Sequence, residues 1–189
     1  TAEENRADAE RLDRLFHTLW SHPCFTIGVV QGVALGGGAG LVSSLDHVIG
    51  ESNTKIALSE GKLGILPAVI GPYVYQRIGS AQTRRLAILA SKIPVDEALR
   101  IGMIDQEVES PDQFEEAIRA TVDEVLTTGP MAVSEAKNLV QTIDRWEASD
   151  EELRSWTLDK TSEMRGSAEG QEGLSSFIER RKAAWKSGD

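Results

Sequence analysis

The pattern of apolar and polar positions predicts helices at both ends of the chain and short strands in its first half. Apolar residues recur at helical spacing near the start, which predicts a helix from Thr1 to Trp20. Short apolar runs between turn residues predict strands at 26–30, 47–50, 55–58 and 105–108. Further helices are expected at 77–90, 94–100, 112–127, 131–146, 150–164 and 172–185. This mixture predicts an α/β fold that ends in a wholly helical segment.

A glycine-rich turn after the first predicted strand carries the clearest functional signal. The strand at 26–30 leads to Gly32, and an amphipathic segment at 39–45 follows the glycines Gly36, Gly37 and Gly38. This order predicts a strand, a tight turn and a helix N-terminus, where free N–H groups and the helix dipole favour a negative oxygen. Glycine is required because a Cβ would block a ligand's approach to the backbone. The turn lacks the features of a phosphate loop or a dinucleotide fingerprint.

Composition narrows the classes of partner. The chain has 189 residues, with 40% hydrophobic and 26% charged residues, which is typical of a globular protein. A net charge of −10 disfavours nucleic acid and anionic membranes as partners, and no apolar run reaches the length of a membrane span. Cys24 is the only cysteine, so an internal disulfide is excluded and a reducing compartment is expected. The sequence contains no cluster with metal-ligand spacing, and we expect no metal.

Four motifs together cover most of the chain: QGVALGGGAGLVSSLDHVI, LSEGKLGILPAVIGPYVYQRIG, EALRIGMIDQEV and EGLSSFIERRKAAW. Their order and spacing resemble the crotonase (enoyl-CoA hydratase/isomerase) superfamily. The resemblance implies a spiral of strand-strand-helix turns over residues 1–110 and a helical trimerisation and CoA-covering segment over residues 111–189. Family members carry about a further third of the chain before this point, including strands and the other oxyanion-hole N–H. This chain is therefore expected to be the C-terminal two-thirds of that fold.

The resemblance also assigns roles to individual residues. The Gly37 N–H would polarise the thioester carbonyl of an acyl-CoA, and Glu60 would face the α and β carbons of the substrate. No separate cofactor is implied, because coenzyme A is part of the substrate. Phe177 would pack on the adenine, and Arg180 or Lys182 would meet a CoA phosphate. Solvated bases on an amphipathic helix remain the alternative for those two cations. Further contacts with the substrate or CoA are implied at Ala34, Leu35, Gly36, Gly38 and Pro67.

Gly40 occupies the position at which the resemblance places a second catalytic glutamate. A glycine cannot transfer protons, so Glu60 is the one carboxylate that the motifs leave for proton transfer, and a glutamate at Gly40 is expected to crowd the substrate. The leading hypothesis is a hydratase (lyase) for an α,β-unsaturated acyl-CoA, most concretely one like 3-methylglutaconyl-CoA. The alternatives are a non-catalytic subunit of a larger assembly and an acyl-CoA isomerase or decarboxylase. We expect a homotrimer or a dimer of trimers, in the cytoplasm or the mitochondrial matrix.

Overall fold

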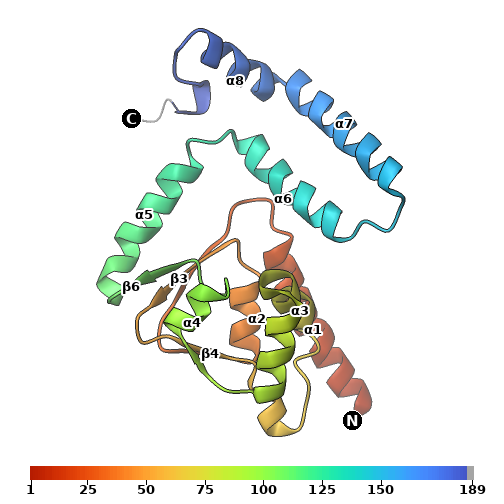
Figure 1. Cartoon of the computed structure of the whole chain (residues 1–189), viewed down its shortest axis with the longest axis vertical. Helices are drawn as coiled ribbons and strands as arrows, with labels where there is room; N and C mark the ends of the chain where they lie inside the picture. The colour runs from red at the N-terminus through yellow and green to blue at the C-terminus, as the bar shows by residue number, and fades with distance from the viewer. Residues whose placement is uncertain (187–189) are drawn as a thin grey trace. The chain divides into compact units, whose positions relative to one another are not determined.

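The computed structural model describes residues 1–186 and divides the chain into two compact units (Figure 1). The core unit comprises residues 1–22 and 26–118, and the helical unit comprises residues 23–25 and those from Arg119 onward. The division falls inside helix α5 (Phe114–Val125), whereas the boundary predicted from the sequence follows Ser110.

Two three-stranded sheets form the framework of the core unit. In the first, all strands are parallel, in the order β1 (Ile27–Val30), β3 (His47–Glu51), β6 (Gln106–Val108). In the second, β4 (Lys55–Ala57) lies between its parallel neighbour β2 (Val33–Leu35) and its antiparallel neighbour β5 (Ile93–Pro94). The chain runs from β1 to β2 and from β3 to β4, crossing between the sheets each time. The predicted strand-strand-helix spiral is confirmed, and β2 is a strand that the sequence pattern did not reveal.

Helices connect these strands. They are α1 (Ala2–Trp20), α2 (Gly37–Ser43), α3 (Gly71–Leu89) and α4 (Val95–Arg100), with short 3₁₀ helices η1 (Ser59–Leu63) and η2 (Pro111–Gln113). Helix α1 was predicted correctly, and it begins with a capping box in which Thr1 and Glu4 satisfy each other's backbone N–H. Helix α3 begins before the predicted start at residue 77, because Pro72 suits a first turn. Its predicted start lies near Gly79, whose φ of 74° interrupts the helix.

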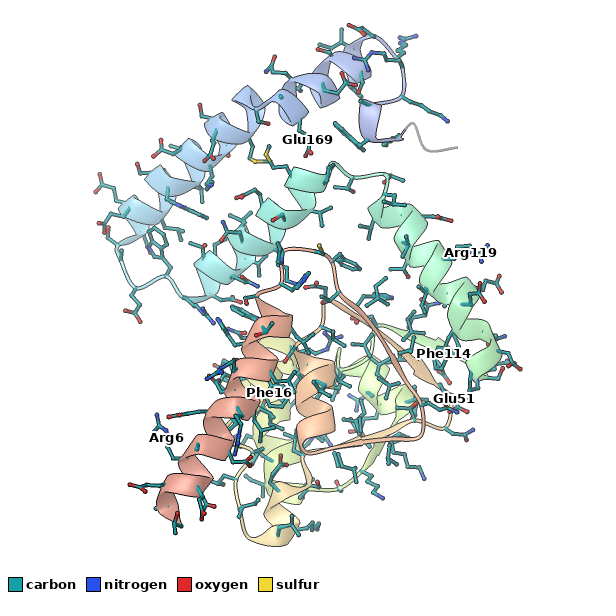
Figure 2. All side chains as sticks on the ribbon, turned by 180° about the vertical axis from the view of Figure 1, so that it is seen from behind. Arg6, Phe16, Glu51, Phe114, Arg119 and Glu169 are labelled. Atoms are coloured by element: carbon teal, nitrogen blue, oxygen red, sulfur yellow. The ribbon has the colours of Figure 1, made fainter. Side chains whose placement is uncertain are left out.

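The core of this unit forms where α1, α2 and α3 meet the sheets. Phe16 of α1, labelled in Figure 2, is 1% exposed. The centroid of its ring lies 5.9 Å from that of the Tyr73 ring on α3. The Arg77 side chain, which is 9% exposed, donates to the carbonyls of Leu45 and Met103 at 2.8 and 3.0 Å and pairs with Asp105. A buried guanidinium is stable only when its donors are satisfied in this way. The ion pair therefore ties α3 to the chain around β3 and β6.

The helical unit contains the end of α5 and three further helices, α6 (Pro130–Asp144), α7 (Asp150–Gly166) and α8 (Ala168–Ile178), followed by the 3₁₀ turn η3 (Ala184–Lys186). Helix α7 begins with a second capping box, made by Ser149 and Glu152. Within residues 1–186, none of the helices has the length and apolar character that crossing a membrane requires.

The last predicted helix, over residues 172–185, is wrong in its second half. Helix α8 ends at Ile178, and the chain then turns through Arg180, which has a φ of +54°. The Arg181 guanidinium reaches back to the Glu172 carboxylate at 2.5 and 2.8 Å, and the Ala184 N–H donates to the same carboxylate at 2.9 Å. These bonds hold a folded-back segment in place of a continuing helix. Trp185 therefore lies against Gly173 and is not part of the exposed face of α8.

Candidate active site

The predicted glycine turn and the predicted carboxylate meet at the ends of two adjacent strands. Strands β2 and β4 are parallel, so their carboxyl ends lie at the same edge of the sheet. After β2 the chain enters the turn at Gly36, and after β4 it continues through Ser59 to Glu60. The Gly36 N–H donates to the Ala57 carbonyl at 3.0 Å and joins the two exits. Residues far apart in the sequence are thereby placed side by side.

Gly36 is the point of contact between the turn and the carboxylate. Its φ is +51°, a conformation that strains any residue with a side chain. A Cβ at this position would lie 3.2 Å from Glu60 Oε1 and 3.6 Å from Ser59 Oγ. Because Gly36 has no side chain, the backbone can turn here, and the side chains of Ser59 and Glu60 have space beside it.

Glu60 has one oxygen without a hydrogen bond. The residue is half-buried, and its Oε2 atom is buried and has no partner among the described residues. Buried carboxylate oxygens are nearly always satisfied in folded proteins, and those that are not call for an explanation. A donor brought by a bound molecule or by water would supply one. The carboxylate therefore lies beside the turn and can accept a hydrogen bond from a ligand or water.

Gly37 presents a backbone N–H to an open space. It is the first residue of α2, whose N-cap Gly36 provides no side-chain bond, and within the described residues no partner for its N–H is found. Gly37 is exposed, and the position of a Cβ on it has no heavy atom within 4 Å. At Gly38, by contrast, a Cβ would lie 3.6 Å from that of Ala34, which is buried. The Gly37 N–H is thus available as a donor on an exposed residue.

Gly40 faces the protein core. Its Cβ position lies 3.0 Å from the Phe16 ring and equally close to Ile70 Cβ, with the Ile70 methyl nearer still. Gly40 itself is buried. A glutamate at this position would meet apolar side chains before it met a ligand, so steric conflict with the core is its first consequence. In this chain, Ile70 and Phe16 pack against the position that a Cβ of residue 40 would take.

The remaining predicted contacts fall into two groups. Leu35 ends β2 and Pro67 follows η1, and both are half-buried residues of the core unit. Phe177, Arg180 and Lys182 belong to the helical unit, where all three are exposed and the Phe177 side chain is 83% accessible. Their roles toward a CoA moiety stay predictions.

Ser59 is a site residue to which sequence reasoning gave no role. It was recognised only as part of the Leu-Ser-Glu motif, and its hydroxyl lies against Gly36 beside Glu60. Ser59 follows β4, which pairs with β2, and this position would have indicated that it lies at the site. The prediction missed it because β2 was not predicted as a strand.

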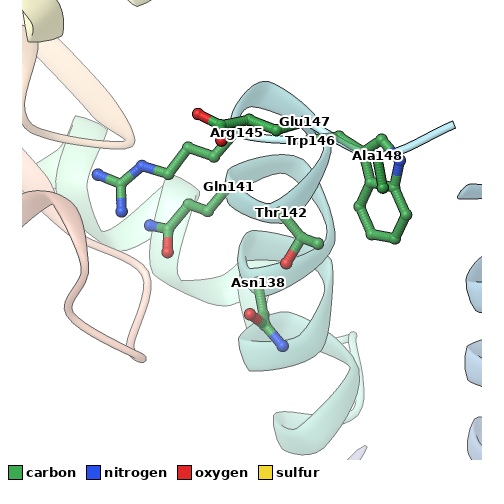
Figure 3. A pocket seen from close by; sticks show the side chains of 7 residues that line it. All are labelled: Asn138, Gln141, Thr142, Arg145, Trp146, Glu147 and Ala148. Carbon is green, nitrogen blue, oxygen red and sulfur yellow. The ribbon is translucent and has the colours of Figure 1, made fainter.

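The described residues of the helical unit enclose hollows at α6. One, of about 510 Å³, lies at the end of α6, where Gln141 and Arg145 extend on one side and the Trp146 ring lies on the other (Figure 3). The second, of about 490 Å³, lies between α6 and α7 and is lined mainly by apolar side chains such as Leu139 and Trp156. Neither hollow contains a residue predicted for the site, so Gly37 and Glu60 remain the focus.

Comparison with known proteins assigns the family. The family described as enoyl-CoA hydratase/isomerase matches residues 2–188, and the chain belongs to it. A putative enoyl-CoA hydratase of Thermus thermophilus is 26% identical over 180 residues. The short-chain-enoyl-CoA hydratase of Clostridium acetobutylicum is 30% identical over 158 residues. An enoyl-CoA hydratase structure from Shewanella pealeana superimposes with a TM-score of 0.91 at 34% identity, covering 98% of this chain.

These relatives are longer than this chain. The matched region covers 95% of this chain and 70% of the Thermus protein, and 82% of this chain and 59% of the Clostridium protein. It covers 68% of the Shewanella structure. The chain thus spans roughly three-fifths to seven-tenths of its relatives.

Proposed function

We propose that the protein adds water to the double bond of an α,β-unsaturated acyl-CoA thioester. The observation that carries this proposal is that Glu60, with its unsatisfied oxygen, lies against Gly36, and that the next residue, Gly37, has an N–H without a partner among the described residues. The names of the relatives support the same reaction class. An acyl-CoA bound at this point would find a general base and an oxyanion donor on adjacent strand ends.

Each atom of the reaction has a place in this scheme. The thioester carbonyl oxygen accepts from the Gly37 N–H, which polarises the conjugated double bond. Glu60 takes a proton from water as the water oxygen bonds to the β carbon, and the electrons of the double bond move to the thioester oxygen as an enolate. The Gly37 N–H stabilises that charge. Glu60 then returns the proton to the α carbon, so one carboxylate closes the cycle.

The acyl group is the finer part of the proposal. Because a Cβ at Gly40 would meet Ile70 and Phe16, a second carboxylate at that position would have to displace core side chains. A substrate that brings its own carboxylate, such as 3-methylglutaconyl-CoA, suits a pocket with a single glutamate. In this assignment, the carboxylate of the substrate takes the place of a second carboxylate from the protein.

The direct test is a panel of acyl-CoA thioesters incubated with the full-length protein and followed by mass spectrometry. Water addition supports the hydratase, and faster turnover of 3-methylglutaconyl-CoA than of crotonyl-CoA supports the finer assignment. Loss of carbon dioxide or migration of the double bond would instead assign a decarboxylase or an isomerase. Binding without any conversion would favour a non-catalytic subunit.

Gly37→Pro tests the oxyanion donor. Proline is tolerated at the first position of a helix, so the change removes the N–H while α2 is expected to persist. Loss of one such donor lowers the rate about a hundred- to a thousandfold. Undiminished turnover by a folded Gly37→Pro protein would remove Gly37 from the mechanism.

A further inference from the structure

Glu60 does not lie alone over Gly36. Ser59 Oγ and Glu60 Oε1 lie 3.6 and 3.2 Å from the same point, the Cβ position of Gly36. Ser59 is half-buried at the start of η1, and within the described part of the chain no hydrogen bond of its hydroxyl is found. Two polar groups therefore converge on one side of the turn, and each has unused hydrogen-bonding capacity.

A single carboxylate leaves the reacting water incompletely held. Water that gives one proton to Glu60 keeps a second O–H, which needs an acceptor if the oxygen lone pair is to point at the β carbon. The space beside Gly40, where a second acid would have to stand, is occupied by Ile70 and Phe16. A serine hydroxyl has two acceptor lone pairs and one donor hydrogen, and it does not titrate in the working range.

We propose that the Ser59 hydroxyl is the second group that holds the attacking water, accepting the O–H that is not given to Glu60. This inference rests on the proposed hydratase function. The bond from the water oxygen to the β carbon forms as Glu60 takes the other proton, and the Ser59 hydroxyl keeps its own hydrogen throughout. Ser59 thus orients the nucleophile, and proton transfer remains with Glu60.

The role separates two reactions that share the same site. Exchange of the α-hydrogen of a saturated thioester, such as butyryl-CoA in D₂O, needs the base and the oxyanion donor but no water at the β carbon. Hydration needs all three groups. Ser59→Ala should therefore lower the hydration rate about tenfold, with the KM unchanged, because one hydrogen bond to the water is lost. Exchange should keep its wild-type rate.

The experiment compares Ser59→Ala, Ser59→Thr, Glu60→Gln and the wild type in the full-length protein, with hydration and α-hydrogen exchange measured for each. Ser59→Thr restores the hydroxyl and should recover most of the hydration rate, whereas Glu60→Gln should lose both reactions. The exposed residue Ser80 provides a matched control, and Ser80→Ala should leave both rates unchanged.

Three results would overturn the inference. Equal hydration by Ser59→Ala and the wild type removes Ser59 from the reaction while leaving the hydratase proposal intact. Equal losses of hydration and exchange in Ser59→Ala would show that the serine acts only by supporting the fold or Glu60. A wild type that hydrates no thioester of the panel would defeat the proposed function itself, and the inference with it.

Discussion

Glu60 and Glu169 each lie beside a glycine at the N-cap of a helix, and they differ in whether their carboxylate oxygens are hydrogen-bonded. Glu60 lies against Gly36, the N-cap of α2, and Glu169 lies against Gly129, the N-cap of α6. Figure 2 labels Glu169. Both caps are glycines that make no side-chain bond of their own. The Glu169 oxygens accept from the Met131 and Ala132 N–H groups at 2.9 and 2.8 Å. Glu169 therefore performs the cap that its glycine cannot.

Glu60 performs no such cap. Its Oε2 is buried without a partner among the described residues, and the N–H of Gly37, the first residue of α2, has no partner there either. The same arrangement of carboxylate, glycine and helix start is thus saturated in the helical unit and open in the core unit. A saturated arrangement stabilises a fold, and an open one has the capacity to act on a ligand. The comparison predicts that changes at the two glutamates affect different quantities.

The largest expected difference is in rate. Glu60→Gln keeps the shape of the side chain but removes its basicity, and turnover should fall about a hundred- to ten-thousandfold. Its melting temperature should stay close to that of the wild type, because no protein hydrogen bond to Oε2 is lost. Glu169→Gln, the matched change, should leave turnover unaltered. Steady-state kinetics and thermal melts of both variants test this, and equal turnover by Glu60→Gln and the wild type would make the catalytic assignment wrong.

A second pair of changes compares the two glycines. Gly36→Ala forces a side chain into a backbone with φ +51° and pushes against Glu60 and Ser59, so unfolding should become easier by roughly 1–3 kcal/mol. Turnover should fall with it, because the carboxylate is displaced. Gly129 has a φ of −60°, so Gly129→Ala carries no backbone strain, and only the contact of the new methyl with the Glu169 side chain opposes folding. Denaturant titration of both variants would contradict the interpretation if Gly36→Ala were the milder change.

The third prediction concerns the cap in the helical unit. Glu169→Ala removes both acceptors at the start of α6 and should lower stability by about 1 kcal/mol, the usual effect of losing an N-cap. Gly129→Ala should have a similar effect, because its methyl would lie 3.1 Å from Glu169 Cγ and closer to the carboxyl group. The double variant should then cost little more than either single one, since both remove the same interaction. Additive losses in a double-mutant cycle would show that the two residues act independently.

The sequence predicted the individual helices and strands better than the contacts between residues of different elements. The helix at α1, the strands β3 and β4 and the glycine turn follow from local patterns and caps, which are legible along the chain. The contact between Gly36 and Glu60 depends on β2, a three-residue strand too short to show a period. The cap by Glu169 was not predicted, because the N–H groups that it accepts from belong to Met131 and Ala132, at the start of α6 and far from Glu169 in the sequence.

The sequence also did not show into which surroundings a side chain would point or where the chain would turn back. The motifs place Gly40 at a catalytic position, but only the packing of Ile70 and Phe16 shows that its missing side chain points into the core. The end of α8 likewise depends on a long-range clasp: the residues from 179 to 185 have a helical pattern, and Arg181 leaves that pattern to bind Glu172. Competition between local propensity and a specific ion pair is resolved only in three dimensions.

The smallest expected effect is the pH response of this Glu172 clasp. Hydrogen bonds from Arg181, followed by the bond from the Ala184 N–H, lower the pKa of Glu172 from 4.5 to about 2. Because the folded pKa lies below the ordinary value, the stabilising contribution is fully present above pH 4.5 and is lost as the pH falls through about 2. The pair is exposed to solvent, so salt should weaken it.

Carboxyl NMR shifts of Glu172 measure this directly. In the wild type we expect the titration midpoint near 2, and in Arg181→Gln a midpoint that moves back toward 4.5, since the largest cause of the shift is removed. Protonation should also release the Ala184 N–H and loosen the bond from Trp185 Nε1 to the Thr127 carbonyl, which is 3.2 Å long. A Trp185 indole signal that broadens in acid together with the Glu172 titration would link the clasp to the folded-back segment. A Glu172 midpoint near 4.5 in the wild type would show that the hydrogen bonds from Arg181 and the Ala184 N–H do not persist in solution.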